Sequence, residues 1–317
     1  MTDLLPSQRS AANYILAVEG YNRVHTKKAT EYLSSTIPEF TCEKGIVITT
    51  TGSDGRSEKS PFSNIELQVI YAPGVISLNL EDKLRSISSS STDIFDSSVE
   101  IKQLNKDSTI QYGENPRNAF PTRMLDAKYL LGDKTTFDLI LPTLYHELQT
   151  VEGKEKLKRF KERKREVKQN LNRVLRQNSS SINLETGELS YVPEDISIRS
   201  TKHAQLRGVQ YSLAYAICAA IANNELQQDA IIDFPKSTAL RLNVLKSQDM
   251  INPSIDIDKV INAYNNCLYW YHLSEEMSLR ENKSIITVNP EELKNSTKII
   301  SDFVNTDSLL SIQKKLF

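Results

Sequence analysis

The chain has 317 residues, of which 39% are hydrophobic and 25% charged, and its formal net charge is −1. These values are typical of a soluble globular protein. Because the net charge is near zero, overall electrostatic attraction does not indicate a protein that binds nucleic acid. The three cysteines, Cys42, Cys218 and Cys267, have neither the spacing of zinc ligands nor the number that a disulfide framework needs. The first residues do not resemble a signal peptide, and the longest apolar run is too short to cross a bilayer. We therefore expect a cytoplasmic protein without a membrane partner.

The first part of the chain predicts a small α/β unit. Apolar residues at helical spacing predict a helix over about residues 8–37, which Pro38 ends. A short helix is expected over 80–87. Three short runs of β-branched or alternating residues predict strands, at 45–51, 65–71 and 98–104.

From about residue 123 onward the pattern is almost entirely helical. The segment 177–200 is polar and contains turn residues, so it predicts a loop that crosses between helices. The expected helices span residues 123–131, 136–148, 154–176, 201–222, 257–278, 290–303 and 308–316. The sequence thus predicts an α+β fold, with an α/β domain over residues 1–120 and a helical bundle over 121–317. A boundary near residue 150 is the alternative.

A glycine–serine turn between the first two expected strands, together with the start of the second strand, contains residues suited to bind phosphate and a divalent metal. The stretch reads TTTGSDGRSEKSPFSNIELQVIY over residues 49–71. Gly52 after a strand lets backbone N–H groups approach phosphate oxygens, and the Ser53 hydroxyl adds a donor. Asn64 and Glu66 are two apart on a strand, so both side chains point to one face. Carboxylates in such positions can hold a divalent metal against a triphosphate.

This stretch resembles the DNA polymerase-β-like nucleotidyltransferase superfamily, whose signature is Gly-Ser, a spacer and Asp-x-Asp/Glu. It looks closest to the protein-PII uridylyltransferases and related signalling nucleotidyltransferases, which carry an arginine and a glutamate where Arg56 and Glu58 stand. The stretch PTRMLDAKYLLGD, residues 121–133, is similar to a second motif of that group, and DISIRSTKHAQLRGVQ, residues 195–210, is weakly similar to a third.

The resemblance implies a nucleotidyltransferase-type mixed sheet with flanking helices. It also implies an enzyme that binds a nucleoside triphosphate with Mg²⁺ and transfers a nucleoside monophosphate to a hydroxyl of a protein or small molecule. Gly52 and Ser53 would hold the phosphates, and Arg56 and Lys128 would contact the nucleotide. Arg123 and Asp126 are expected mainly to fix their helix against the sheet through an ion pair.

One position departs from the family pattern. Asn64 stands where the family has its first metal carboxylate, so the site loses one charge, while Glu66 is retained. The third carboxylate is expected at Glu100, as metal ligand or base, with Asp96 and Asp93 as rivals. The expected metal ligands are therefore Asn64, Glu66 and Glu100, and the expected catalytic residues are Glu66 and Glu100. The alternative is a degraded member that senses nucleotide or binds a partner without catalysis.

The expected helix Lys154–Arg176 is strongly basic. It holds eleven Lys or Arg residues against three glutamates, a net charge of +8. Such runs are usually solvated helix faces. The alternative is a basic wall beside the nucleotide cleft, or a surface that binds an acidic partner, a protein acceptor or an RNA backbone. Because it holds only one aromatic residue, we do not expect it to bind single-stranded nucleic acid by stacking.

Overall fold

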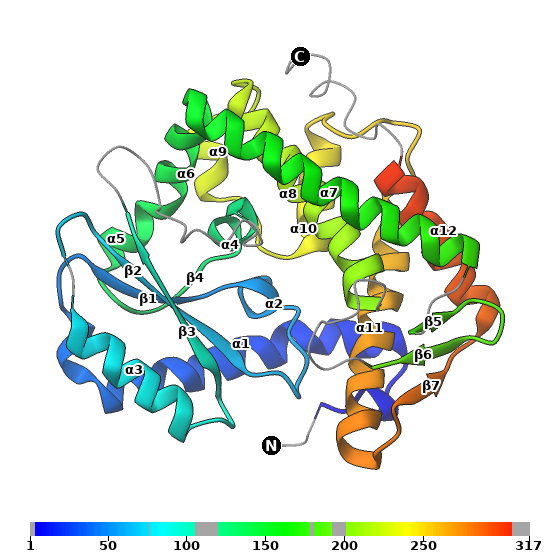
Figure 1. Cartoon of the computed structure of the whole chain (residues 1–317), viewed down its shortest axis with the longest axis horizontal. Coiled ribbons are helices and arrows are strands. Elements are labelled where there is room, and N and C mark those ends of the chain that lie inside the picture. The colour runs from blue at the N-terminus through cyan, green and yellow to red at the C-terminus, as the bar shows by residue number, and fades with distance from the viewer. Residues whose placement is uncertain (1–3, 76, 105–119, 178–180, 192–200, 306–317) are drawn as a thin grey trace.

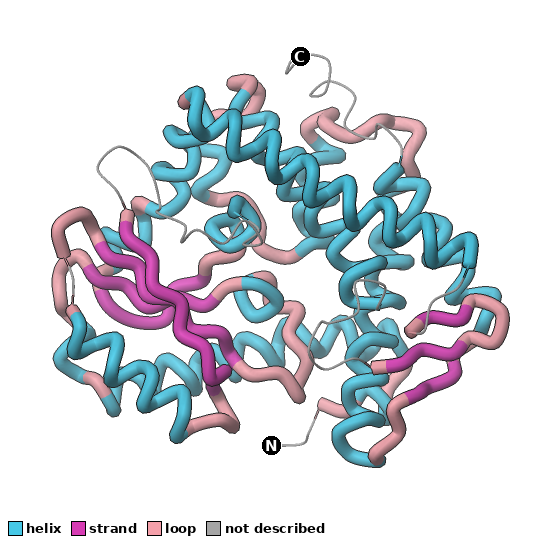
Figure 2. The backbone as a smooth tube through the Cα atoms, in the orientation of Figure 1, coloured by secondary structure: helices cyan, strands magenta, loops and turns pink. Residues whose placement is uncertain are grey.

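The chain adopts an α+β fold in which helices outnumber strands and two small sheets lie apart from each other (Figures 1 and 2). The computed structural model describes residues 4–75, 77–104, 120–177, 181–191 and 201–305.

The larger sheet has four strands in the order β3-β2-β1-β4. Their bounds are β1 (Ile46–Thr50), β2 (Ile65–Tyr71), β3 (Phe95–Gln103) and β4 (Lys128–Gly132). β1 runs antiparallel to both β2 and β4, while β3 runs parallel to β2, so the sheet is mixed.

Each face of this sheet packs against a different set of helices. Helices α1 (Ala11–Thr36) and α3 (Leu78–Ser90) cover the lower face in Figure 1. Their apolar side chains form one core with alternate residues of the strands, such as Ile48 and Leu67. The alternate residues Val47 and Ile70 instead join the core of the helical part. Because successive side chains of a strand point to opposite faces, the sheet connects the two cores.

The helical part is built around α8 (Arg207–Ala222), in which all residues but Arg207 and Gln210 are buried. The long helix α7 (Val151–Gln177) crosses the top of the molecule in Figure 1, and α11 (Ile257–Glu281) descends beside α8. No helix among the described residues is both long and apolar enough to span a membrane. The remaining helices are α4 (Phe120–Leu125), α5 (Lys134–Asp138), α6 (Ile140–Gln149), α9 (Gln228–Ile232), α10 (Thr238–Ser247) and α12 (Pro290–Asn305).

Most of the expected elements are confirmed, but two are wrong. The segment 123–131 was expected as one helix. Its first residues instead form the end of helix α4, which stops at Leu125, and residues from Lys128 onward form the edge strand β4. The sheet therefore continues beyond residue 120, where the sequence placed the end of the α/β part. Within the expected loop 177–200 lie two short strands, β5 (Ile182–Asn183) and β6 (Glu188–Ser190), which form a second sheet with β7 (Ile285–Thr287). The expected helix 308–316 lies outside the described residues.

Candidate functional site

A four-residue helical turn, α2 (Gly52–Gly55), follows β1 directly and forms the floor of the site. Gly52 begins it at φ +64°, in the left-handed region that glycine adopts without a Cβ clash. The N–H groups of Gly55 and Arg56 donate to backbone carbonyls within the segment. Since the first N–H groups of a helix have no acceptor inside it, those of Gly52 and Ser53 are available to an anion.

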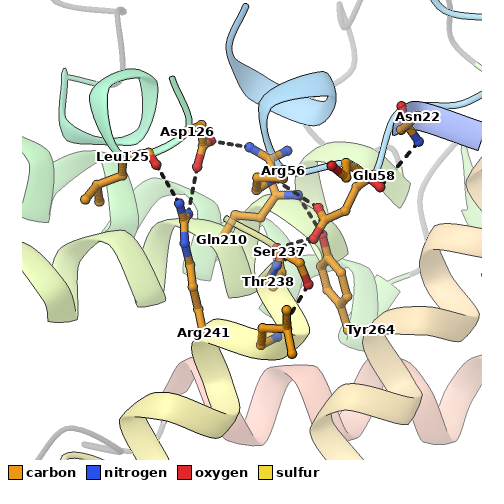
Figure 3. Close-up of polar contacts among 12 residues, drawn as sticks. Asn22, Arg56, Glu58, Leu125, Asp126, Gln210, Ser237, Thr238, Arg241 and Tyr264 are labelled. Atoms are coloured by element: carbon orange, nitrogen blue, oxygen red, sulfur yellow. Dashed lines mark hydrogen bonds and ion pairs between the residues drawn. The ribbon is translucent and has the colours of Figure 1, made fainter. Parts of the chain in front are cut away.

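Arg56, the residue after the turn, belongs to a buried network of charged side chains (Figure 3). Its Nη1 donates to Oδ2 of Asp126 at 2.5 Å, and its Nε donates to Oε2 of Glu58 at 2.9 Å. The other oxygen of Asp126 accepts from Nη1 of Arg241 at 2.7 Å. All four side chains are buried. Two guanidinium groups and two carboxylates balance in charge, which is the condition for burying ions without a large desolvation cost.

Glu58 connects this network to the helical part. Its Oε1 accepts from the backbone N–H of Thr238 at the start of α10, and its Oε2 accepts from the hydroxyl of Tyr264 on α11, both at 2.7 Å. Burial raises the pKa of Tyr264, and the Glu58 carboxylate raises it further. Burial alone would lower the pKa of Arg56, but Asp126 and Glu58 raise it above its ordinary value, so the guanidinium stays charged.

A second buried cluster lies beside α1, beneath the turn. Burial raises the pKa of Asp54, and the nearby ammonium groups of Lys128 and Lys59 oppose that rise. Lys59 is fully buried, its Nζ donates to the backbone oxygen of Ser63 at 2.7 Å, and burial lowers its pKa to about 8. Nζ of Lys128 donates to Oγ1 of Thr26 on α1 at 2.9 Å. This cluster supports the turn from the side away from the helical part.

A cavity of about 210 Å³ lies between the turn, the large sheet and the helical part. From the sheet side it is lined by Gly52, Ser53 and Glu66. A Cβ added to Gly52 would lie 3.9 Å from Oε2 of Glu66, so this carboxylate faces the turn across the cavity. The strand-ending turn and a carboxylate of the neighbouring strand therefore share one space.

The helical part closes the cavity with cationic and aromatic side chains. Lys202 lies in the π-helical segment Thr201–Leu206 that precedes α8, and Arg207 is the first residue of α8. Both line the cavity together with Arg123 of α4. Tyr211 of α8 and Tyr271 of α11 add aromatic surface, and Nζ of Lys202 lies 5.6 Å from the centroid of the Tyr271 ring. The lining therefore has a charged side and an aromatic side.

No protein-family model matches the chain, and no curated protein matches it either.

Of the seven residues expected to bind nucleotide or metal, four line this cavity, namely Gly52, Ser53, Arg56 and Glu66. Arg56 does so as a buried partner of Asp126 and Glu58, and Asp126 accepts from Arg56 and Arg241. Asp126 therefore fixes the segment between α4 and β4, and it does so through ion pairs with Arg56, after the turn, and with Arg241 of α10.

Lys128 lies on the face of the sheet opposite to Glu66 and is not among the residues that line this cavity. It pairs in register with Thr50, and Thr50 pairs with Leu67 of the α1–α3 core. Glu66, one residue before Leu67, points the other way because side chains alternate along a strand. Lys128 therefore supports the turn from beneath.

The three residues expected to hold Mg²⁺ are not gathered around one point. Nδ2 of Asn64 donates to the backbone oxygen of Thr92 at 2.7 Å. Glu100 forms an ion pair with Arg123. Glu66 alone of the three lines the cavity. Among the described residues, no three His, Cys, Asp or Glu side chains are grouped as metal ligands. This donor set does not fit a two-metal site, which needs several carboxylates around each ion.

Sequence reasoning missed the residues that the helical part contributes. Arg241 lies on the short helix α10 and Tyr264 on α11, and nothing in the local sequence distinguishes them from surface or core positions. Lys202 and Arg207 follow the polar segment 192–200, and their only signal was the weak similarity of residues 195–210 to the third motif.

Proposed function

We propose that this protein is a regulatory module that binds a nucleoside triphosphate in the cavity between the large sheet and the helical part. One observation carries the proposal: the Gly52–Ser53 turn lines the same cavity as three cationic side chains from other elements, Arg123, Lys202 and Arg207. Backbone N–H groups and cationic side chains that converge on one space are suited to a chain of phosphates.

The aromatic side of the cavity supports a nucleotide over a simple phosphate. Tyr211 and Tyr271 line it together with Leu206 and Leu268. Aromatic and aliphatic side chains offer a planar base a stacking surface at little entropic cost. Binding of this kind would fix the helical part relative to the sheet, because the ligand would contact both.

Transfer of a nucleoside monophosphate to a hydroxyl of a protein or small molecule is the second candidate. Glu66 favours it, because this carboxylate faces both the turn and the cavity. Asn64 and Glu100 favour binding without transfer, since the Asn64 amide carries no charge for a metal and Glu100 is paired with Arg123.

Calorimetric titration of the full chain with ATP, GTP, CTP and UTP tests the proposal. We expect at least one to bind with a Kd below roughly 1 mM. Arg207→Ala should weaken that binding by roughly tenfold, as expected for loss of one charge-assisted contact. Lys246→Ala is the matched control, because this exposed lysine of α10 pairs only weakly, at 3.9 Å, with Asp258. Failure of all four nucleotides to bind would overturn the proposal.

A second measurement separates binding from transfer. Wild-type protein and Glu66→Gln are incubated with radiolabelled nucleotide and Mg²⁺, with the chain itself and a cell extract as acceptors. Incorporation by the wild type that Glu66→Gln abolishes would establish the transferase. Binding without incorporation supports the regulatory module.

A further inference from the structure

The ion pair between Arg123 and Glu100 lies at the edge of the cavity, where a metal would otherwise be expected. Glu100 on β3 stands in register with Gln68 of β2, and Gln68 is two residues from Glu66. The side chains of Glu66, Gln68 and Glu100 therefore leave the same face of the sheet. Nη1 of Arg123 contacts Oε1 of Glu100 on that face, and Arg123 also lines the cavity.

We infer that Arg123, and not a divalent cation, supplies the positive charge beside Glu100 that neutralises the bound phosphates, so that the protein binds metal-free nucleotide. The inference rests on the proposed nucleotide-binding function of the same cavity. Oε1 of Glu100, which is paired with the guanidinium of Arg123, is not available to a metal. The guanidinium has five N–H donors in a planar fork, so those that do not face Glu100 can bind phosphate oxygens.

Neighbouring contacts hold Arg123 in this position. It lies on α4 three residues before Asp126, whose two oxygens accept from Arg56 and Arg241. Nη2 of Arg241 also donates to the backbone oxygen of Leu125, at 2.8 Å.

The charges around the cavity agree with a site for free anions. Its lining contains four cationic side chains, those of Arg56, Arg123, Lys202 and Arg207. It contains three acidic ones, Glu58, Glu66 and Asp126, of which Glu58 and Asp126 form ion pairs with Arg56. The lining is thus positive without a metal, and a metal bound at Glu66 would have a single carboxylate.

The test compares the affinity of the wild-type protein in EDTA and in Mg²⁺. Titrations use ATP, GTP, CTP and UTP, with inorganic tripolyphosphate as a probe for the phosphate end alone. We expect the nucleotide that binds to do so in EDTA within about threefold of its affinity in Mg²⁺. Binding that requires Mg²⁺ would overturn the inference and leave the proposed function intact. Absence of binding in both buffers would overturn the proposed function and the inference with it.

Substitutions at Arg123 and Glu100 distinguish a guanidinium from a bound metal as the source of positive charge. Arg123→Gln should weaken binding in EDTA by roughly tenfold or more, and Arg123→Lys should restore part of it. Glu100→Gln should leave affinity unchanged or increase it, because it removes a competing carboxylate. If Glu100 were a metal ligand, Glu100→Gln would instead weaken binding in Mg²⁺, and Arg123→Gln would not. Arg280→Gln, at an exposed position near the end of α11, is the matched control, and thermal unfolding of each variant verifies folding.

Discussion

Oδ2 of Asp126 accepts a hydrogen bond from Nη1 of Arg56 at 2.5 Å, and both side chains are buried. This contact joins the turn after β1 to the segment between α4 and β4, and Arg241 extends it to α10. The floor of the cavity is therefore held in place by contacts with the helical part as well as by the sheet.

Asp126→Asn should destabilise the fold by about 3–5 kcal/mol, because it leaves two buried guanidinium groups opposite a neutral amide. Urea unfolding followed by circular dichroism measures the change. Asp138→Asn is the control, since Asp138 is exposed and pairs with Lys134 one turn away. Its cost should stay below about 0.5 kcal/mol. Equal effects of the two substitutions would show that the buried network does not stabilise the fold.

Tyr264→Phe should cost about 1–3 kcal/mol, because it removes a buried hydroxyl that donates to Glu58 and accepts from Gln210. The same unfolding measurement applies. Tyr269→Phe provides a comparison on the same helix, since its hydroxyl donates over longer distances, 3.3 and 3.2 Å, to the backbone oxygens of Pro6 and Arg9. A larger loss at Tyr269 than at Tyr264 would contradict this account of Glu58.

Gly55→Ala should be far more destabilising than Gly52→Ala. A Cβ at Gly55 would lie 1.9 Å from the backbone oxygen of Asp126, so a backbone segment must move, at a cost of at least about 3 kcal/mol. A Cβ at Gly52 has room but meets the strain of φ +64°, worth about 1–2 kcal/mol. Gly74→Ala, at φ +80° with nothing within 4 Å, isolates that strain. Comparable losses at Gly55 and Gly74 would show that the turn does not approach Asp126 so closely.

Lys59 should make stability depend on pH in the alkaline range. Burial lowers its pKa from 10.5 to about 8, although Asp54 and Glu275 oppose the shift. Between these two values the unfolded chain binds a proton that the folded chain does not, so the free energy of unfolding rises with pH. Relative to Lys59→Met, the wild type should gain at most roughly 3 kcal/mol between pH 8 and 10.5. Urea titrations of both proteins at several pH values measure this. If the difference in free energy of unfolding between the two proteins stayed constant with pH, burial would not lower the pKa of Lys59.

Local patterns predicted the β1–turn–β2 unit correctly. The β-branched run of 46–50 and the alternation of 65–71 became adjacent antiparallel strands, with the glycine turn at the end of the first. Strand register then follows from burial of one set of alternate residues. The placement of Glu66 opposite Gly52 was therefore predictable from the sequence.

The segment after α4 was not predictable in the same way. Residues 128–132 are compatible with a helix, and they form a strand because the free edge of β1 offers backbone partners there. Asp126 forms ion pairs with two arginines, Arg56 and Arg241, which lie 70 and 115 residues away along the chain. That strand pairing places Lys128 beneath the turn.

By itself, the sequence determined the elements whose signals lie within a few residues: helical periodicity, short β-branched strands, and a glycine where the backbone needs a positive φ. Only the tertiary structure decided which charged side chains meet, namely Arg56 with Asp126 and Arg123 with Glu100, and that Lys202 and Arg207 line the same cavity as the turn. The physical reason is range. Backbone conformation responds to neighbouring residues, whereas a buried ion pair depends on which surfaces come together across the folded chain.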